Sequence, residues 1–305
     1  MSFSRTPIQL ACILFVGTLL AAANFGKPGI RGESQDPTES VAEPQVFAGG
    51  VYMDVAKGLV AFPVVVEVTD ALLEYLVVGA HGAAHESMFV TGADAEIVNA
   101  GLLAAGLVPG SNARWVPKDP APSREERRAG VSPYDVELPS GDAVYLYVGW
   151  REDGEVYWYR AEDLVRDTSR GRTMRRHSWI FLGSRLVTLA TRPAEELFAA
   201  TVEGNWINLP FFAAGSTLVT SALPESVEQS VWLPNAWLLP HRGSGLLMVA
   251  STSRLAAPPQ GLLERLPLVV AGEVTKVEPA FEKQRHVPQK QQAGNSDDKA
   301  GGDVR

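Results

Sequence analysis

Short apolar runs rich in β-branched and aromatic residues, separated by Gly, Pro or Asn, recur along most of the chain. In GGVYMDVAKGLVAFPVVVEV, residues 49–68, two such runs flank the tripeptide AKG. Gly58 can supply the positive φ that a tight connection between antiparallel strands requires. The segment therefore predicts a β-hairpin.

A second hairpin is predicted in DAVYLYVGWREDGEVYWYRAEDLV, residues 142–165. Tyrosines repeat at every second position on both sides of Asp153-Gly154, which places them on one face of each strand. Further strands are expected in three segments that are short, apolar and bounded by Gly, Pro or Asn: SWIFLGSRLVTLA (178–190), LFAATVEGNWINLP (197–210) and SGLLMVAST (244–252).

One segment has helical rather than strand periodicity. Asp94 is a suitable N-cap, and Ile97, Val98 and Leu102 then recur at helical spacing before Gly106 ends the run. We expect one packed helix near 94–106. The predicted fold class is α+β and mostly β, an antiparallel sheet or sandwich with this single helix.

The N-terminal stretch MSFSRTPIQLACILFVGTLLAAANFG has one Arg, an apolar run from Ile8 to Leu20 and then three alanines. This pattern is typical of a secretory signal peptide, predicted at 1–23 with cleavage near Ala23. The run is short of the ~20 residues that a spanning helix needs. The alternative is an uncleaved N-terminal membrane anchor, which would be the chain's only association with a membrane.

Two segments have too little apolar surface to offset the entropy of ordering. Residues 24–45 predict a disordered tether and residues 282–305 a disordered, Gln-rich tail. The folded domain is expected at 46–255. Residues 256–281 form an extension that the pattern of apolar and polar residues assigns neither to the domain nor to the tail.

Net charge and cysteine content argue against nucleic-acid binding, disulfides and thiolate metal sites. The formal net charge is -8, which argues against nucleic-acid binding, because an acidic protein repels phosphate backbones. The single cysteine, Cys12, lies inside the predicted signal segment. A cleaved product has neither a disulfide nor a thiolate metal site.

Two histidines four residues apart, His81 and His85, precede Glu86 in GAHGAAHES. On a helix this spacing could hold zinc, with Glu86 as ligand or base. The neighbouring glycines and the apolar run after Ser87 indicate a turn entering a strand instead. The second interpretation is that His85, Glu86 and Ser87 form a structural polar cluster in which His85 and Glu86 pair with each other or with nearby backbone groups, because burial would otherwise cost free energy. No cofactor is expected on this interpretation.

An arginine-rich loop, RDTSRGRTMRRHSW, covers residues 166–179. Its guanidinium groups could form an anion-binding rim for phosphate or acidic polysaccharide, and a solvated loop is the alternative. The candidate anion ligands are Arg170, Arg172, Arg175 and Arg176.

The stretch LLEYLVVGAHGAAHESMFVTGADAEIVNAGLLAAGLVPG, residues 72–110, resembles the signature of the YdjY-like domain family of bacterial proteins. The resemblance extends over about 46–252 and implies a strand, a Gly-rich turn, His-Glu-Ser, a second strand and a short Ala/Leu helix. Two positions depart from the pattern: Asn99 stands where members often have His, and His81 where a turn residue is usual. The family implies no established activity.

The chain has no Gly-x-Ser-x-Gly elbow and no Gly-rich nucleotide loop. We therefore expect an exported, envelope-associated module in the periplasm or outside the cell, with a non-enzymatic role in binding or scaffolding an envelope ligand or protein. The alternative is a metal-assisted hydrolase centred on His85 and Glu86, with zinc as its cofactor.

Overall fold

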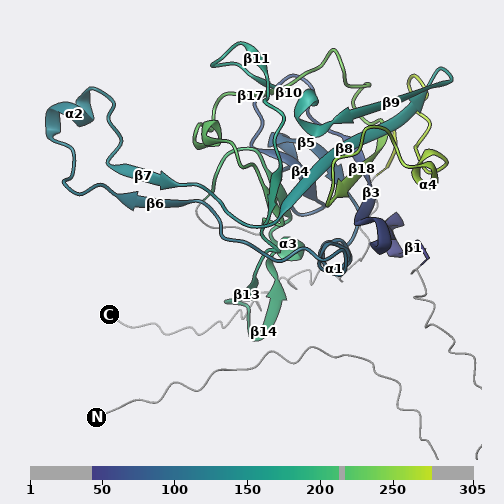
Figure 1. Ribbon diagram of the computed structural model, residues 1–305, viewed down its shortest axis with the longest axis horizontal. Helices are drawn as coiled ribbons and strands as arrows, with labels where there is room; N and C mark the ends of the chain where they lie inside the picture. The colour runs from purple at the N-terminus through teal and green to yellow at the C-terminus, as the bar shows by residue number, and fades with distance from the viewer. Residues whose placement is uncertain (1–42, 213–216, 277–305) are drawn as a thin grey trace, which may run out of the picture. The chain divides into compact units, whose positions relative to one another are not determined.

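The computed structural model describes residues 43–212 and 217–276 (Figure 1). The predicted signal segment at 1–23, nearly all of the predicted tether and the predicted tail at 282–305 lie outside the described residues. Within the described part, no helix is long and apolar enough to cross a membrane.

The main sheet closes into an eight-stranded barrel. Around the barrel the strands follow the order β3 (Leu59–Val66), β18 (Gly245–Ser251), β8 (Ala143–Glu152), β12 (Trp179–Phe181), β16 (Val219–Thr220), β15 (Asn205–Asn208), β4 (Tyr75–Gly79) and β5 (Ser87–Thr91). β5 then pairs with β3 through Val65 and Val90, which joins the two ends. The mostly β class is confirmed, but the main sheet is a barrel rather than the expected antiparallel sheet or sandwich, because this non-local pairing closes the ring of eight strands.

Two neighbouring pairs in the barrel, β4–β5 and β15–β16, are parallel, and the other pairs are antiparallel. Only residues 80–86 connect β4 to β5. The chain must therefore run back along the barrel within this segment, which contains the predicted His81 to Glu86 turn.

Both predicted hairpins are present. β2 (Tyr52–Asp54) pairs with β3, and Gly58 has the expected positive φ of 63°. β8 pairs with β9 (Glu155–Arg160) across Asp153 and Gly154, whose φ angles are 51° and 82°. β1 (Gln45–Val46) extends the first hairpin by pairing with β2.

Side chains alternate between the inside and the outside of the barrel, as strand geometry requires. In β8, Leu146 and Val148 join the main core, whereas Tyr147 belongs to a second apolar cluster. This second cluster includes Leu262 and Leu266, in and just after α4 (Gln260–Leu263). Part of the unassigned extension therefore packs against the outer face of β8, β18 and their neighbours.

The predicted helix is α1 (Ala95–Ala104), and the Asp94 carboxylate accepts from the backbone N–H groups at its start. Val98 and Leu102 line the same internal space as Phe62 and Trp206 of the barrel. The helix therefore buries its apolar face against the barrel core, as its periodicity predicts.

The remaining elements extend from the barrel or cover it. β6 (Arg114–Pro117) and β7 (Tyr134–Glu137) form an arm that carries α2 (Arg124–Arg128), and β13 (Leu186–Leu189) and β14 (Arg192–Phe198) form a second arm (Figure 1).

A small sheet contains β11 (Arg172–Thr173), β10 (Val165–Asp167) and β17 (Trp232–Pro234). The predicted strand at 197–210 is interrupted by α3 (Ala199–Val202). Short 3-10 helices lie at Ala48–Gly50, Val55–Lys57, Ala84–Glu86, Ala161–Leu164 and Pro224–Val227.

Candidate functional site

The predicted His85–Glu86 pair lies in the 3-10 turn just before β5, at the surface of the barrel. His85 Nε2 and Glu86 Oε1 are 3.7 Å apart, and the two side chains are 80% and 40% exposed. Water reaches both groups, so burial does not enforce this contact, and the structural role expected for the pair stays a prediction. His81 is also exposed.

Ser87 does not share this surface. Its side chain is fully buried, and its hydroxyl donates to the Phe89 carbonyl at 2.8 Å. Among residues 43–212 and 217–276, no three His, Cys, Asp or Glu side chains are grouped so that they could hold a metal ion. The zinc hypothesis for His81, His85 and Glu86 stays a prediction.

The turn is nevertheless tightly constrained by its glycines. The Gly79 N–H donates to the Gly204 carbonyl at 2.7 Å, and the Ala83 N–H donates to Asn205 Oδ1 at 3.1 Å. A Cβ on Gly82 would lie 2.5 Å from the Gly204 carbonyl oxygen and 2.6 Å from Val78 Cβ. Gly82 is thus required for the close approach of two backbone segments.

The four candidate arginines of the 166–179 loop are each paired with a carboxylate of the protein. Their ion pairs are Arg170 with Asp167 and Glu228, Arg172 and Arg175 with Glu225, and Arg176 with Asp163. Arg175 and its neighbours hold the pKa of Glu225 well below its usual range, at about 2. Of the four arginines, Arg176 lines the cavity described next.

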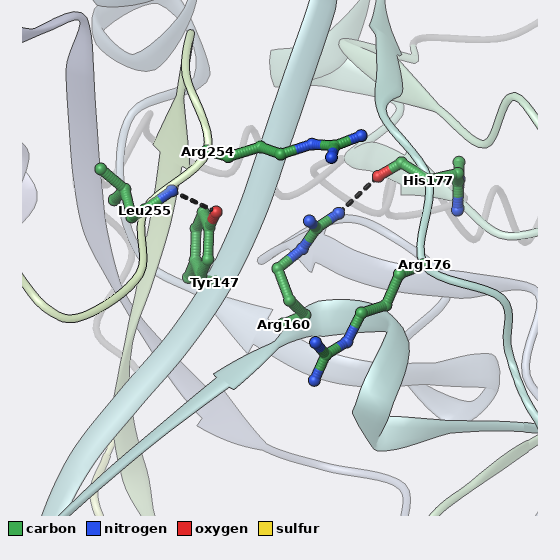
Figure 2. A pocket seen from close by; sticks show the side chains of 6 residues that line it. All are labelled: Tyr147, Arg160, Arg176, His177, Arg254 and Leu255. Carbon is green, nitrogen blue, oxygen red and sulfur yellow. Dashed lines mark hydrogen bonds between the residues drawn. The ribbon is translucent and has the colours of Figure 1, made fainter.

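A cavity of about 290 Å³ lies on the outer face of the barrel beside β8 (Figure 2). Its lining residues are Tyr147, Arg160, Arg176, His177, Arg254 and Leu255. Sheet register brings together three distant segments, because Tyr147 in β8 is the cross-strand partner of both Arg160 in β9 and Val249 in β18. Arg254 and Leu255 follow the end of β18, and the loop before β12 supplies the other two residues.

Arg160 lines the cavity and is held by several contacts. Its Nε and Nη2 donate to the two carboxylate oxygens of Glu162 at 3.1 and 2.5 Å, and Nη2 also donates to the His177 carbonyl. Its guanidinium carbon is 5.4 Å from the ring centroids of both Tyr145 and Tyr147, within cation–π range. These contacts fix the guanidinium in one orientation and, within the described chain, leave Nη1 without a hydrogen bond.

Glu162 is fully buried beneath this guanidinium. Burial raises the pKa of its carboxyl, and the charge of Arg160 and the hydrogen bonds from Arg160 and the His177 N–H oppose that rise. The His177 N–H donates to Glu162 Oε1 at 3.1 Å. Glu162 therefore supplies acceptors for two otherwise buried donors.

His177 is held between the Arg175 carbonyl, 3.0 Å from Nδ1, and Ser221 Oγ, 3.2 Å from Nε2. A carbonyl can only accept, so the hydrogen bond at Nδ1 requires a proton there, and Nε2 of the neutral ring then accepts from the Ser221 hydroxyl. Burial lowers the pKa of His177 to about 4, which makes the ring neutral at pH 7.

This Ser–His–Glu arrangement has the order of a nucleophile, a base and an acid, but the hydroxyl is not placed for catalysis. Ser221 is fully buried, and its Oγ also accepts from Ser226 Oγ at 2.8 Å and from the Leu223 N–H at 3.2 Å. The lining of the cavity includes His177 and not Ser221. The geometry therefore holds the loop in place and does not present a nucleophile to a ligand.

Arg254 differs from the other two arginines of the cavity. Its guanidinium lies 5.5 Å from the Tyr145 ring centroid, and no carboxylate of the described chain is within ion-pair distance of it. Arg254 is exposed. Among the residues that the structure describes, one positive charge of the cavity therefore has no carboxylate partner.

Sequence reasoning missed Arg160, Glu162, His177 and Arg254. The sequence offered one signal. Arg160 follows the alternating aromatic residues of a predicted strand, and strand alternation places its charged side chain on the same face as Trp158. Nothing local distinguishes Arg254 from a solvated arginine.

No family model, curated protein or solved structure matches this chain. Its resemblance to the YdjY-like domain family stays a prediction.

Proposed function

We propose that this protein is an exported, non-enzymatic module that binds a small anionic ligand in the cavity around Arg254. The observation that carries the proposal is the unmatched guanidinium of Arg254 beside Arg160 and Arg176. Guanidinium groups bind carboxylates and phosphates through charge-assisted hydrogen bonds, which are stronger than neutral ones.

The size and rigidity of the cavity support binding. Its volume of about 290 Å³ is near the lower end of the range found for small-molecule sites. Arg160 is fixed by Glu162, and Arg176 is fixed by a two-point contact with Asp163 at 2.8 and 2.7 Å. A ligand would therefore bind without the entropy cost of ordering these two side chains.

The export part of the proposal rests on the N-terminal apolar run and the alanines that follow it. An envelope protein meets small anions and anionic polymers outside the cytoplasm, and this site would bind one acidic group of such a ligand.

The test is a titration of the full chain with acetate, benzoate, sulfate and inorganic phosphate, followed by calorimetry and by the thermal midpoint. We expect at least one anion to bind and to stabilise the fold, as any ligand specific for the native state must. Arg254→Gln should weaken that binding at least tenfold, because it removes the unmatched charge.

The matched control is Arg166→Gln. Arg166 is also an exposed arginine without an ion-pair partner in the described chain, but it lies on β10 and does not line the cavity. Binding that is equally weakened in both variants, or unchanged in Arg254→Gln, would refute the proposal.

A further inference from the structure

The protein's own charges indicate how much negative charge the cavity can accept. Three arginines line it, and the carboxylates of Glu162 and Asp163 already neutralise Arg160 and Arg176. His177 adds no charge near pH 7, because burial lowers its pKa to about 4. The lining and its ion-pair partners therefore carry one net positive charge, that of Arg254.

The unused hydrogen-bond donors favour a planar acceptor. Among contacts within the described chain, Arg160 and Arg176 use Nε and Nη2, which leaves each Nη1 unpaired, and Arg254 has its whole guanidinium fork available. A guanidinium fork matches the two coplanar oxygens of a carboxylate in a bidentate contact.

The cavity is also amphipathic. In Figure 2 the guanidinium groups of Arg160 and Arg254 point toward the His177 side, and Tyr147 and Leu255 lie on the other side. The Tyr147 ring stacks on Trp158 at a centroid distance of 5.2 Å, and its hydroxyl accepts from the Leu255 N–H at 2.6 Å. This wall is therefore rigid, and Leu255 is its more accessible apolar residue, because Tyr147 is only 2% exposed.

We propose that the ligand of this cavity is a monocarboxylate carried on a small apolar or aromatic body, with its carboxylate on Arg254 and its body against Leu255, beside Tyr147. This inference rests on the proposed function and deepens it. A dianionic phosphate is disfavoured, because its second charge would be desolvated without a partner.

The experiment is calorimetry on the full chain at pH 7.5 with benzoate, benzamide, acetate and phenyl phosphate. Benzamide keeps the body and removes the charge, and acetate keeps the charge and removes the body. Phenyl phosphate is dianionic at this pH, because the second ionisation of a phosphate monoester lies at about pH 6. We expect benzoate to bind at least about tenfold more tightly than each of the other three.

Two variants locate the parts of the ligand. Arg254→Gln should abolish the preference for benzoate over benzamide, and Leu255→Ala should reduce the preference for benzoate over acetate while acetate affinity stays unchanged. Arg166→Gln should alter neither ratio.

The outcomes separate this inference from the proposed function. Tighter binding of phenyl phosphate than of benzoate, lost in Arg254→Gln, would overturn the monocarboxylate and leave the anion site intact. Equal binding of benzoate and benzamide would also overturn it, and the absence of binding by every probe here and in the anion titration would refute both proposals.

Discussion

Two histidine–glutamate pairs in this protein have nearly the same separation and opposite surroundings. His85 Nε2 lies 3.7 Å from Glu86 Oε1, and His177 Nδ1 lies 3.6 Å from Glu162 Oε1. The first pair is 80% and 40% exposed, and the second is 8% and 0% exposed. Distance alone would rank them as equals.

Because one pair is exposed and the other is buried, the two pairs should contribute differently to the stability of the fold. In solvent, water replaces any contact that His85 or Glu86 loses, and salt screens their attraction. Beneath the cavity, Glu162 must satisfy Arg160 and the His177 N–H, because no water replaces a lost acceptor. The His85–Glu86 pair, which is conspicuous in the sequence, should therefore contribute less to stability than Glu162, which no sequence motif marks.

The largest expected effect is at Glu162. Glu162→Ala removes the acceptors of two buried donors and should lower the free energy of unfolding by about 3 to 5 kcal/mol, as when one partner of a buried ion pair is removed. Glu162→Gln should cost less, because it keeps one acceptor oxygen for the Arg160 guanidinium and the His177 N–H. Urea melts of both variants measure the difference, and equal losses would show that the charge, not the acceptor, is what matters.

The next effect is a pH dependence that His177 confers. Its pKa is about 4 in the folded protein against 6.5 as the ordinary value, so between these values the unfolded chain binds the proton and the folded chain does not. Stability should therefore be fully present above pH 6.5 and be lost as the pH falls toward 4, by about 3 kcal/mol for this gap.

His177→Gln isolates that contribution, because glutamine cannot titrate and other carboxyl groups are unchanged. Urea melts at pH 4.5, 5.5 and 7 should show a smaller loss of stability for the variant than for the wild type. Parallel pH profiles would mean that His177 is charged in the folded protein as well.

The smallest effects are expected in the His81 to Glu86 turn, where we expect its glycine to outweigh its ionisable groups. Gly82→Ala should cost about 1 to 3 kcal/mol, because its Cβ would overlap the Gly204 carbonyl oxygen, 2.5 Å away. His81→Ala and His85→Ala should each stay within about 0.5 kcal/mol of the wild type, as is usual at exposed positions. Glu86 is half-buried, and Glu86→Ala should cost less than about 1 kcal/mol, because water still reaches its carboxylate. A loss of more than 1 kcal/mol in Glu86→Ala would show that the pair is structural after all.

Features formed by neighbouring residues were predictable from the sequence, and features formed by residues far apart in the sequence were not. The hairpins at Gly58 and at Asp153-Gly154, and the helix beginning at Asp94, were predictable because turn, cap and periodicity signals lie within a few neighbouring residues. Barrel closure was not, because the pairing of Val65 with Val90 leaves no local mark in either strand.

The candidate site shows the same limit. Arg160, Glu162 and His177 lie within one segment, but their mutual contacts depend on how the loop folds back over the strand end. Arg254 joins them only because β18 pairs with β8 in a register that sets Val249 opposite Tyr147. The exposure of His85 was likewise hidden, because an apolar run after a turn does not show how deeply the turn itself lies.

The sequence by itself therefore determined the local elements: strands from alternation, turns from glycine and helix α1 from its cap and period. The tertiary structure alone decided which polar groups lose contact with water, and with that the lowered pKa of His177 and, among the described residues, the unmatched charge of Arg254. The physical reason is that desolvation and charge pairing depend on neighbours in space, and the register of distant strands sets those neighbours.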